Sequence, residues 1–170
     1  DFNQGIVVQS YCKGIDWVIA GNKITRGGGI CNVSLVGLPS WYHQYIGNEI
    51  LVGNGSKGPI GDMPPRDSYL SATGENVTRF TVFRRNLLHN NARIVIGADR
   101  WEGRSGEGND VVIDQNIIND NEVGIALPPR NNGVLLWGNR FEQVKEPIVG
   151  LSEGVYMHPA ERLLNLLSAE

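Results

Sequence analysis

The sequence predicts an all-β fold, a right-handed parallel β-helix (solenoid) of about five to six coils that ends in a short C-terminal helix. An Asn recurs at positions 22, 48, 86, 116 and 139, with an apolar residue two places after it and usually apolar residues three and five places before it. The intervals of 26, 38, 30 and 23 residues suit solenoid coils with variable loops. Charged residues make up only 19% of the chain while Gly counts 22, which favours many tight turns between short strands.

Each repeat consists of a short strand, the Asn and a second short strand. The five segments are Trp17–Ile24, Tyr45–Ile50, Thr81–Leu88, Val111–Ile118 and Val134–Phe141. Their apolar residues are predicted to point inward and to form columns when the coils stack at about 4.8 Å. Asn suits the corner between the strands because it tolerates left-handed backbone angles and because its side-chain amide bonds to the Asn of the next coil.

A third strand of each coil is predicted to follow the Asn by eight or nine residues. It is seen at Gly29–Ile30, Arg93–Ile96, Gly124–Leu127 and Pro147–Val149, and Gly5–Val8 resembles the same element of an earlier coil. The second repeat has no clear copy, so a long loop is expected there. Hairpins of an antiparallel fold are the alternative, but the Asn-Gly pairs that they favour occur only at Asn54-Gly55 and Asn132-Gly133.

Residues 1–157 are predicted to form the coils, and residues 158–170 a capping helix or tail. Leu163, Leu164 and Leu167 have helical spacing behind Pro159, so this helix is expected to cover the last coil, with a role in binding a membrane or a partner as the alternative. No cap precedes the first apolar strand. We therefore expect a fragment of a longer β-helix, with upstream coils or a partner chain covering the N-terminal end.

Composition excludes several classes of partner. The net charge of −3 argues against nucleic acid, and the absence of an apolar run of membrane-spanning length argues against a membrane span. No leader opens the chain, so any export signal is expected to lie upstream or to have been removed. Cys12 and Cys31 are interpreted as two buried thiols, with a disulfide between them as the alternative.

The repeat pattern resembles right-handed parallel β-helix proteins of the pectate-lyase-like superfamily, in particular secreted bacterial β-helix-repeat proteins. The resemblance covers roughly residues 5–150 and is specific for the fold rather than for an activity. It implies an extracellular or periplasmic protein that binds and degrades a polysaccharide, as a lyase or a glycoside hydrolase. The alternative is a non-catalytic module, glycan-binding or structural, of a surface protein or tailspike.

Three insertions are expected to leave the stack beside the third strands and to wall a groove: Val36–Gln44, Gly53–Arg79 and Gly97–Asn109. Aromatic rings there would stack on sugar rings, and guanidinium groups would pair with uronate carboxylates. The predicted substrate-binding residues are Trp41, Tyr42, His43, Arg66, Trp101 and Arg104.

Two chemistries remain open for cleavage. In a lyase, Lys57 or Arg100 would abstract the proton, and Asp62 with Asp67 would hold a calcium ion, the only cofactor that this alternative requires. In a hydrolase, Asp99 and Glu102 would be the two carboxylates beside the bond. His43 and His89 have no partner at metal-ligand spacing, so no metal site is predicted from them.

Overall fold

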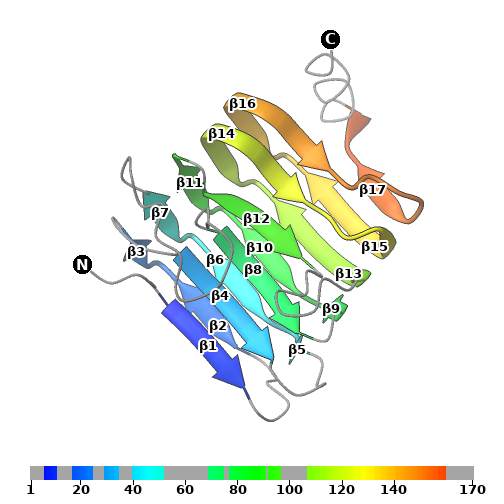
Figure 1. The fold of residues 1–170 in the computed structure, drawn as a ribbon, viewed down its shortest axis with the longest axis horizontal. Helices are drawn as coiled ribbons and strands as arrows, with labels where there is room; N and C mark the ends of the chain where they lie inside the picture. Colours follow the sequence, from blue (N-terminus) through cyan, green and yellow to red (C-terminus); the bar gives the residue numbers. More distant parts are fainter. Residues whose placement is uncertain are drawn as a thin grey trace, which may run out of the picture.

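The computed structural model of the chain describes residues 6–10, 17–24, 29–34, 40–51, 69–74, 77–90, 92–96 and 107–159. These residues are built from β-strands, and no helix is among their elements. The strands form two sheets, and every pairing described between them is parallel. The fold is therefore all-β with parallel sheets, as the sequence predicts (Figure 1).

Sheet B, the eight-stranded sheet, holds the strand that directly precedes each repeat Asn. Its strands are β2 (Val18–Ala20), β5 (Ser40–Trp41), β6 (Gln44–Ile46), β9 (Val77–Arg79), β10 (Val82–Arg84), β13 (Glu107–Asp114), β15 (Arg130–Trp137) and β17 (Val155–Met157). Two short strands among them, β5 and β9, come just before β6 and β10 in the chain.

Sheet A, the nine-stranded sheet, holds the strands that follow each Asn. They are β1 (Ile6–Ser10), β3 (Lys23–Ile24), β4 (Gly29–Ser34), β7 (Glu49–Leu51), β8 (Tyr69–Gly74), β11 (Leu87–His89), β12 (Arg93–Ile96), β14 (Ile117–Ala126) and β16 (Arg140–Val149). Two branches, β3-β7-β11 and β1-β4-β8-β12, meet in β14, which pairs with β11 near its start and with β12 near its end.

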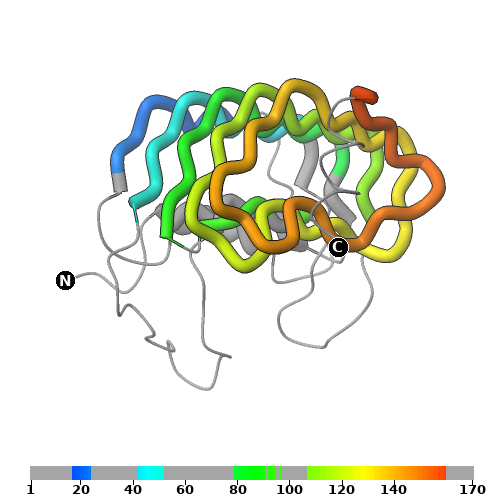
Figure 2. The backbone as a smooth tube through the Cα atoms, turned by 90° about the horizontal axis from the view of Figure 1, so that it is seen from above, coloured from blue at the N-terminus to red at the C-terminus, as the bar shows by residue number. Residues whose placement is uncertain are grey.

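At every repeat Asn the chain passes from sheet B to sheet A, and it returns to sheet B before the next one. Figure 2 shows these passages side by side along the molecule, from blue to orange. The register keeps equivalent residues opposite each other: Phe83 pairs with Tyr45 on one side and with Ile113 on the other. Equal positions of successive repeats therefore lie in rows across both sheets.

The core lies between the two sheets, and three such rows make up most of it. Sheet B contributes the residues three places before each Asn, and sheet A contributes those two places after it together with those of the third strand. The fully or almost fully buried members are Ile19, Tyr45, Phe83, Ile113, Leu136, Ile50, Leu88, Ile118, Ile94, Ile125 and Ile148. The other buried members of the core are Ala92, Ile96, Val111, Leu127 and Val134. The rings of Tyr45 and Phe83 stack with centroids 4.8 Å apart. Burial of each large apolar side chain stabilises the fold by about 1.5–3 kcal/mol.

The repeat asparagines form one hydrogen-bonded column, as the sequence predicts. The Oδ1 atom of each Asn after the first accepts both the backbone N–H and the Nδ2–H of the Asn one repeat earlier, at 2.9–3.2 Å. Each Nδ2 from the second repeat on also donates to a main-chain carbonyl one repeat earlier. These carbonyls belong to Ile19, Tyr45, Phe83 and Ile113 and lie at 2.8–2.9 Å. The column thus satisfies buried polar groups that strands leave at a sharp corner.

The left-handed residue of this corner is the one before the Asn, so the prediction that the Asn itself takes left-handed angles is wrong. The residues with φ between 55° and 65° at this position are Gly21, Gly47, Arg85, Gln115 and Gly138. The Asn side chain can bond to its neighbours in both directions because its own backbone stays in the ordinary region.

The long loop expected at Gly53–Arg79 is shorter than predicted. Tyr69–Gly74 forms β8, the missing third strand of the second repeat, between β4 and β12. Val77–Arg79 forms β9, which belongs to an unpredicted row with β5 and with the first parts of β13 and β15. A third prediction, three separate strands in every repeat, fails at β14 and β16, where the second and third strands are one continuous ten-residue strand.

The described residues end at Pro159, just after β17, so the predicted helix beyond it lies outside them. No helix in the described ranges is long and apolar enough to cross a membrane. Cys31 lies in β4, and Cys12 lies outside the described residues, so the interpretation of the two as buried thiols stays a prediction.

Candidate functional site: the outer face of sheet B

Most of the residues predicted to bind or cleave a substrate lie outside the described ranges. These are Lys57, Asp62, Arg66, Asp67, Asp99, Arg100, Trp101, Glu102 and Arg104. Their roles, and the calcium site at Asp62 and Asp67, stay predictions. The described residues include no group of three or more His, Cys, Asp or Glu side chains placed to hold a metal ion.

The remaining predicted residues, Trp41, Tyr42 and His43, are consecutive in the chain but occupy different structural environments. Trp41 is in β5, where it pairs in register with Arg79 of β9. Tyr42 occupies the next corner, with a φ of 62°, and its exposed ring stacks on Phe80 with centroids 4.8 Å apart. His43 is buried in the interior, two places before Tyr45, so it does not belong to the exposed surface on which it was predicted.

The outward residues of sheet B form two rows that the repeat positions define. The first row lies two places before each Asn and contains Ala20, Ile46, Arg84, Asp114 and Trp137. The second row lies four places before each Asn and contains Val18, Gln44, Val82, Val112 and Leu135, with Tyr156 as the next residue in register. We call this surface the outer face of sheet B.

Arg84 and Asp114 form an ion pair across β10 and β13 on this face. The Nε of Arg84 lies 2.9 Å from both Oδ1 and Oδ2 of Asp114. The carboxylate is only 6% exposed, although its strand position points outward. The hydrogen bond that Arg84 donates to Asp114 and the negative charge of Asp114 raise the pKa of the Arg84 guanidinium, which therefore stays cationic throughout the range in which proteins fold.

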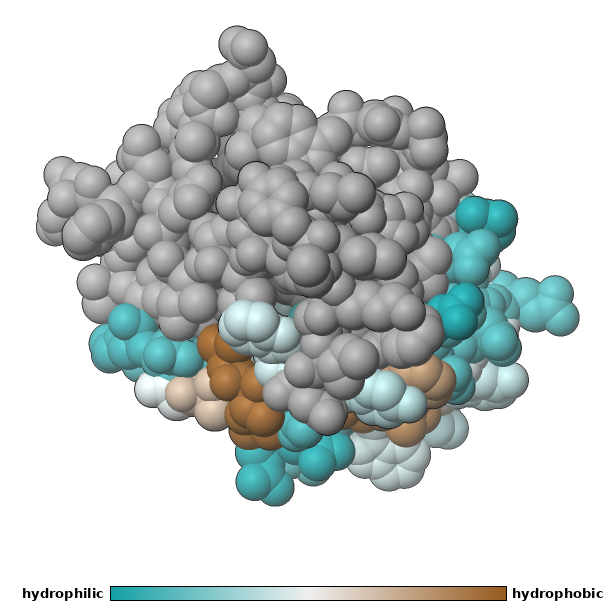
Figure 3. Space-filling view, turned by 90° about the horizontal axis from the view of Figure 1, so that it is seen from below, coloured by the Kyte–Doolittle hydropathy of each residue, from teal (hydrophilic) through white to brown (hydrophobic). Residues whose placement is uncertain are grey.

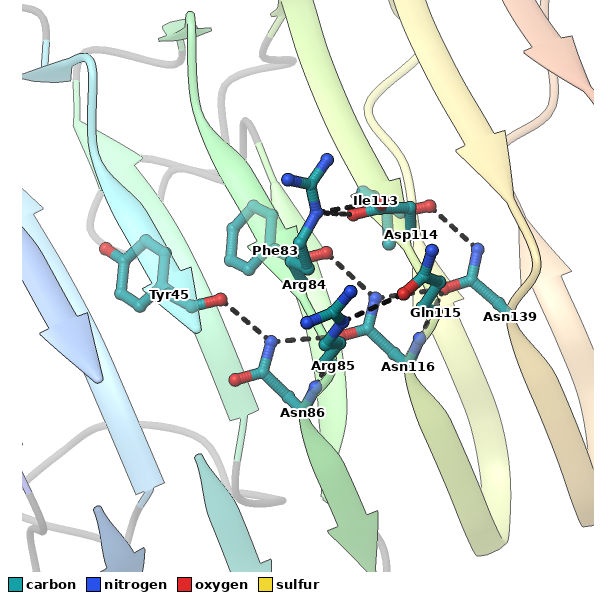
Figure 4. Close-up of polar contacts among 10 residues, drawn as sticks. All are labelled: Tyr45, Phe83, Arg84, Arg85, Asn86, Ile113, Asp114, Gln115, Asn116 and Asn139. Carbon is teal, nitrogen blue, oxygen red and sulfur yellow. Dashed lines mark hydrogen bonds and ion pairs between the residues drawn. The ribbon is translucent and has the colours of Figure 1, made fainter. Parts of the chain in front are cut away.

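The guanidinium of Arg84 is held by its Nε edge, which leaves its other edge open. Figure 4 shows both terminal nitrogens pointing away from Asp114. No described residue accepts a hydrogen bond from them. Across the adjacent corner, Arg85 Nε donates to Gln115 Oε1 at 2.9 Å, so the same two repeats are linked a second time. Arg84 is thus oriented by the protein and still able to donate outward.

Large exposed rings lie at the C-terminal side of the outer face. Trp137 is 50% exposed and Tyr156 is 64% exposed, and the exposed Leu135 lies in register with Tyr156. The His158 ring meets the indole of Trp137 edge-on, with centroids 4.5 Å apart, and so restrains it. Figure 3 shows apolar residues (brown) at the described surface beside hydrophilic ones (teal). The face therefore combines flat apolar rings with an oriented charged pair.

Sequence reasoning missed this face although the signal was present. Leu136 lies three places before Asn139 and was correctly assigned to the core. Alternation along a strand then requires that its neighbour Trp137 points outward. The register of the Asn column likewise places Arg84 opposite Asp114, because each lies two places before its Asn.

Comparisons with models of known protein families, with curated proteins and with solved structures find no match to this chain.

Proposed function

We propose that the two parallel sheets are faces of a right-handed parallel β-helix, in which each repeat is one coil. The proposal is supported by the single Asn column, by the parallel pairing of equal positions, and by the passage from sheet B to sheet A at every Asn. The right-handed sense follows from the strong preference of parallel crossover connections for that hand.

The proposed function of this β-helix is to bind a polysaccharide outside the cell, along the outer face of sheet B. The observation that carries it is the exposure of Trp137 and Tyr156 on a flat sheet, beside an Arg84 guanidinium fixed by Asp114. Aromatic rings offer their faces to the apolar faces of sugar rings, while oriented polar groups bind their hydroxyls. A net charge of −3 also disfavours nucleic acid as the ligand.

Affinity electrophoresis and a glycan array, run with a panel of neutral and acidic polysaccharides, test this function. We expect retention by at least one polymer. The double variant Trp137→Ala with Tyr156→Ala should weaken its binding by about tenfold or more, because each ring contributes on the order of 1 kcal/mol. Arg84→Gln should weaken it by a smaller factor. Trp17→Ala, which removes an exposed Trp outside this face, is the matched control and should bind like the parent.

Two results would contradict the proposal: no retention by any polymer, or retention unchanged in the double variant. Cleavage of the bound polymer is the more specific prediction, and it rests on the sequence-predicted residues Lys57, Asp62, Asp99, Arg100 and Glu102. A fall in polymer viscosity would support a catalytic protein, of the lyase type if Arg100→Ala abolishes it and of the hydrolase type if Asp99→Asn does. Binding without any fall in viscosity would support the non-catalytic glycan-binding module.

A further inference from the structure

The Asn column has a direction. Each internal Asn offers Oδ1 to the repeat before it, and its N–H and one Nδ2–H to the repeat after it. Asn48 illustrates this, since its Oδ1 accepts two hydrogen bonds from Asn22 while its own N–H and Nδ2–H donate to Oδ1 of Asn86. The two ends of the column are therefore chemically different: an acceptor faces the N-terminal side.

Asn22, the first member of the column, departs from this pattern on its N-terminal side. Its Nδ2 donates to the carbonyl of Ala20 in its own repeat, at 3.2 Å, instead of to a carbonyl one repeat earlier. Its Oδ1 accepts no hydrogen bond from any residue that the structure describes. Asn22 therefore presents the acceptor that, at the other positions, receives two donors from a preceding repeat.

The strand beside Asn22 is also open on the same side. β2 pairs with β6, and no other described strand pairs with it. Trp17 is 42% exposed, whereas His43 and Thr81 at the same position of the following repeats are buried. Val18 is 60% exposed, whereas Gln44 and Val82 at its position are only partly exposed. Exposed strand edges in proteins are usually protected by charges, Pro or a bulge, and β2, with the sequence Val-Ile-Ala, has none of these residues.

The outermost strand of sheet A at the C-terminal end contains residues of the kinds that protect a strand edge from pairing with another strand. β16 contains Arg140, Glu142, Lys145, Glu146 and Pro147. Pro147 has no backbone N–H to donate, and charged side chains oppose the approach of another strand. β2 therefore differs from β16 in composition, although β17, the outermost strand of sheet B at that end, is Val-Tyr-Met and likewise contains no charged residue or Pro.

We propose that the N-terminal edge, formed by Trp17, β2 and Asn22, is a docking surface for a further repeat of the same kind. A strand of that repeat would pair in parallel with β2 and cover Val18 and Trp17. A left-handed residue and an Asn would follow this strand. The N–H and Nδ2–H of this Asn would donate to Oδ1 of Asn22, as Asn22 itself donates to Asn48.

A second copy of this chain is a poor fit as the occupant. The last strand that the structure describes is β17, in which Met157 is in register with Leu136. Two residues later, Pro159 takes the position that Gly138 holds with a φ of 65°. The Pro ring fixes φ near −65°, so this repeat lacks the left-handed corner that brings an Asn into the column.

A grafted repeat tests the proposal. The residues Glu107–Val123 contain a strand, a corner, the Asn and a second strand, so a copy of them is placed directly in front of Gly5. The join is in register, because Ile6 continues the row of Ile30, Leu70, Ile94 and Ile125. Gly5 then takes the place of Gly124. The matched control carries the same graft with its copy of Asn116 replaced by Ala.

We expect the graft to raise Tm by about 4–8 °C and the Ala control by less than half of that. Acrylamide quenching of Trp17 should fall in the grafted chain. The contribution of Trp17 is isolated as the difference between each chain and its Trp17→Phe variant. Equal Tm and equal quenching in the parent, the graft and the control would overturn the proposal.

A titration that needs no grafted chain covers the case in which the graft does not fold. A labelled peptide with the sequence of Glu107–Asp120 is added to the parent chain, beside a peptide with Ala in place of Asn116. Preferential binding of the Asn peptide with protection of Trp17 supports the proposal, and equal binding of both peptides contradicts it. A parent chain that is a dimer with Trp17 already protected would identify a second copy as the occupant and would likewise contradict it.

Discussion

The N-terminal and C-terminal halves of the molecule build the same repeat with very different lengths of chain. Asn48 and Asn86 are 38 residues apart, and the strands around them have three residues each. Asn116 and Asn139 are only 23 residues apart, and β13 to β16 have eight to ten residues each. The side-chain hydrogen bonds of the two pairs are nevertheless alike, at 3.1 and 2.9 Å. A longer interval between two repeat Asn residues therefore does not disturb the column.

The halves also differ in what they carry. The long intervals of the N-terminal half contain the sequence-predicted catalytic and substrate-binding residues. The C-terminal half, with little chain outside its strands, carries the exposed rings of Trp137 and Tyr156. The proposed recognition of a polymer would therefore use mainly the regular half, and the predicted chemistry would use the long intervals of the other half.

The largest effect is expected from breaking the column in either half. Asn86→Ala removes the acceptor of both Asn48 donors and the side-chain bonds to the Tyr45 carbonyl and to Asn116 Oδ1, and should lower the free energy of unfolding by about 3 kcal/mol. Asn116→Ala removes the equivalent bonds and should cost the same within about 0.5 kcal/mol. Urea denaturation measures both values. A much smaller loss for Asn86→Ala would mean that the long interval weakens the column.

Two Gly substitutions, one in each half, should lower the stability by different amounts. At Gly124 in β14, an added Cβ would lie 2.6 Å from the carbonyl oxygen of Pro147 in β16, so Gly124→Ala should cost about 2 kcal/mol. At Gly47 the space is open but φ is +61°, so Gly47→Ala should cost about 1 kcal/mol of backbone strain. Thermal unfolding of the two variants and of the parent measures which substitution lowers the stability more. A larger loss for Gly47→Ala than for Gly124→Ala would show that backbone strain outweighs packing at these positions.

The smallest effect is expected from shortening the long interval itself. Replacing residues 52–68 with a short Gly-Ser link should change the free energy of unfolding by less than about 1 kcal/mol, because loop length enters loop-closure entropy only logarithmically. Urea denaturation is the measurement, with polysaccharide retention as a second readout. A loss of several kcal/mol would place this segment among the elements that hold the repeats together.

The sequence predicted which side chains are buried wherever an Asn marks the register. Phe83, three places before Asn86, faces the core. Arg84, two places before it, faces outward because successive side chains of a strand point to opposite faces. It did not predict β8, because Tyr-Leu-Ser-Ala-Thr-Gly has small polar residues and no Asn to mark its register. It also misplaced the left-handed residue, since Arg85 and Gln115 give no composition signal for a positive φ.

The candidate site required information that local patterns do not hold. Arg84 and Asp114 are 30 residues apart, and their pairing follows only from the register between β10 and β13. Trp137 is restrained by His158, which comes from the next strand along sheet B. Both contacts are set by how repeats stack, so a single repeat read alone does not reveal them.

The alternation around each Asn has a consequence for how this gene can change. From five places before the Asn to two places after it, inward and outward positions alternate along each strand, and the corner between the strands has two exposed residues in a row, such as Arg84 and Arg85. Losing or gaining one codon in that stretch would exchange the buried and exposed faces of a strand. Viable insertions and deletions should therefore be confined to the segments between these stretches, where the number of residues already varies from one repeat to the next.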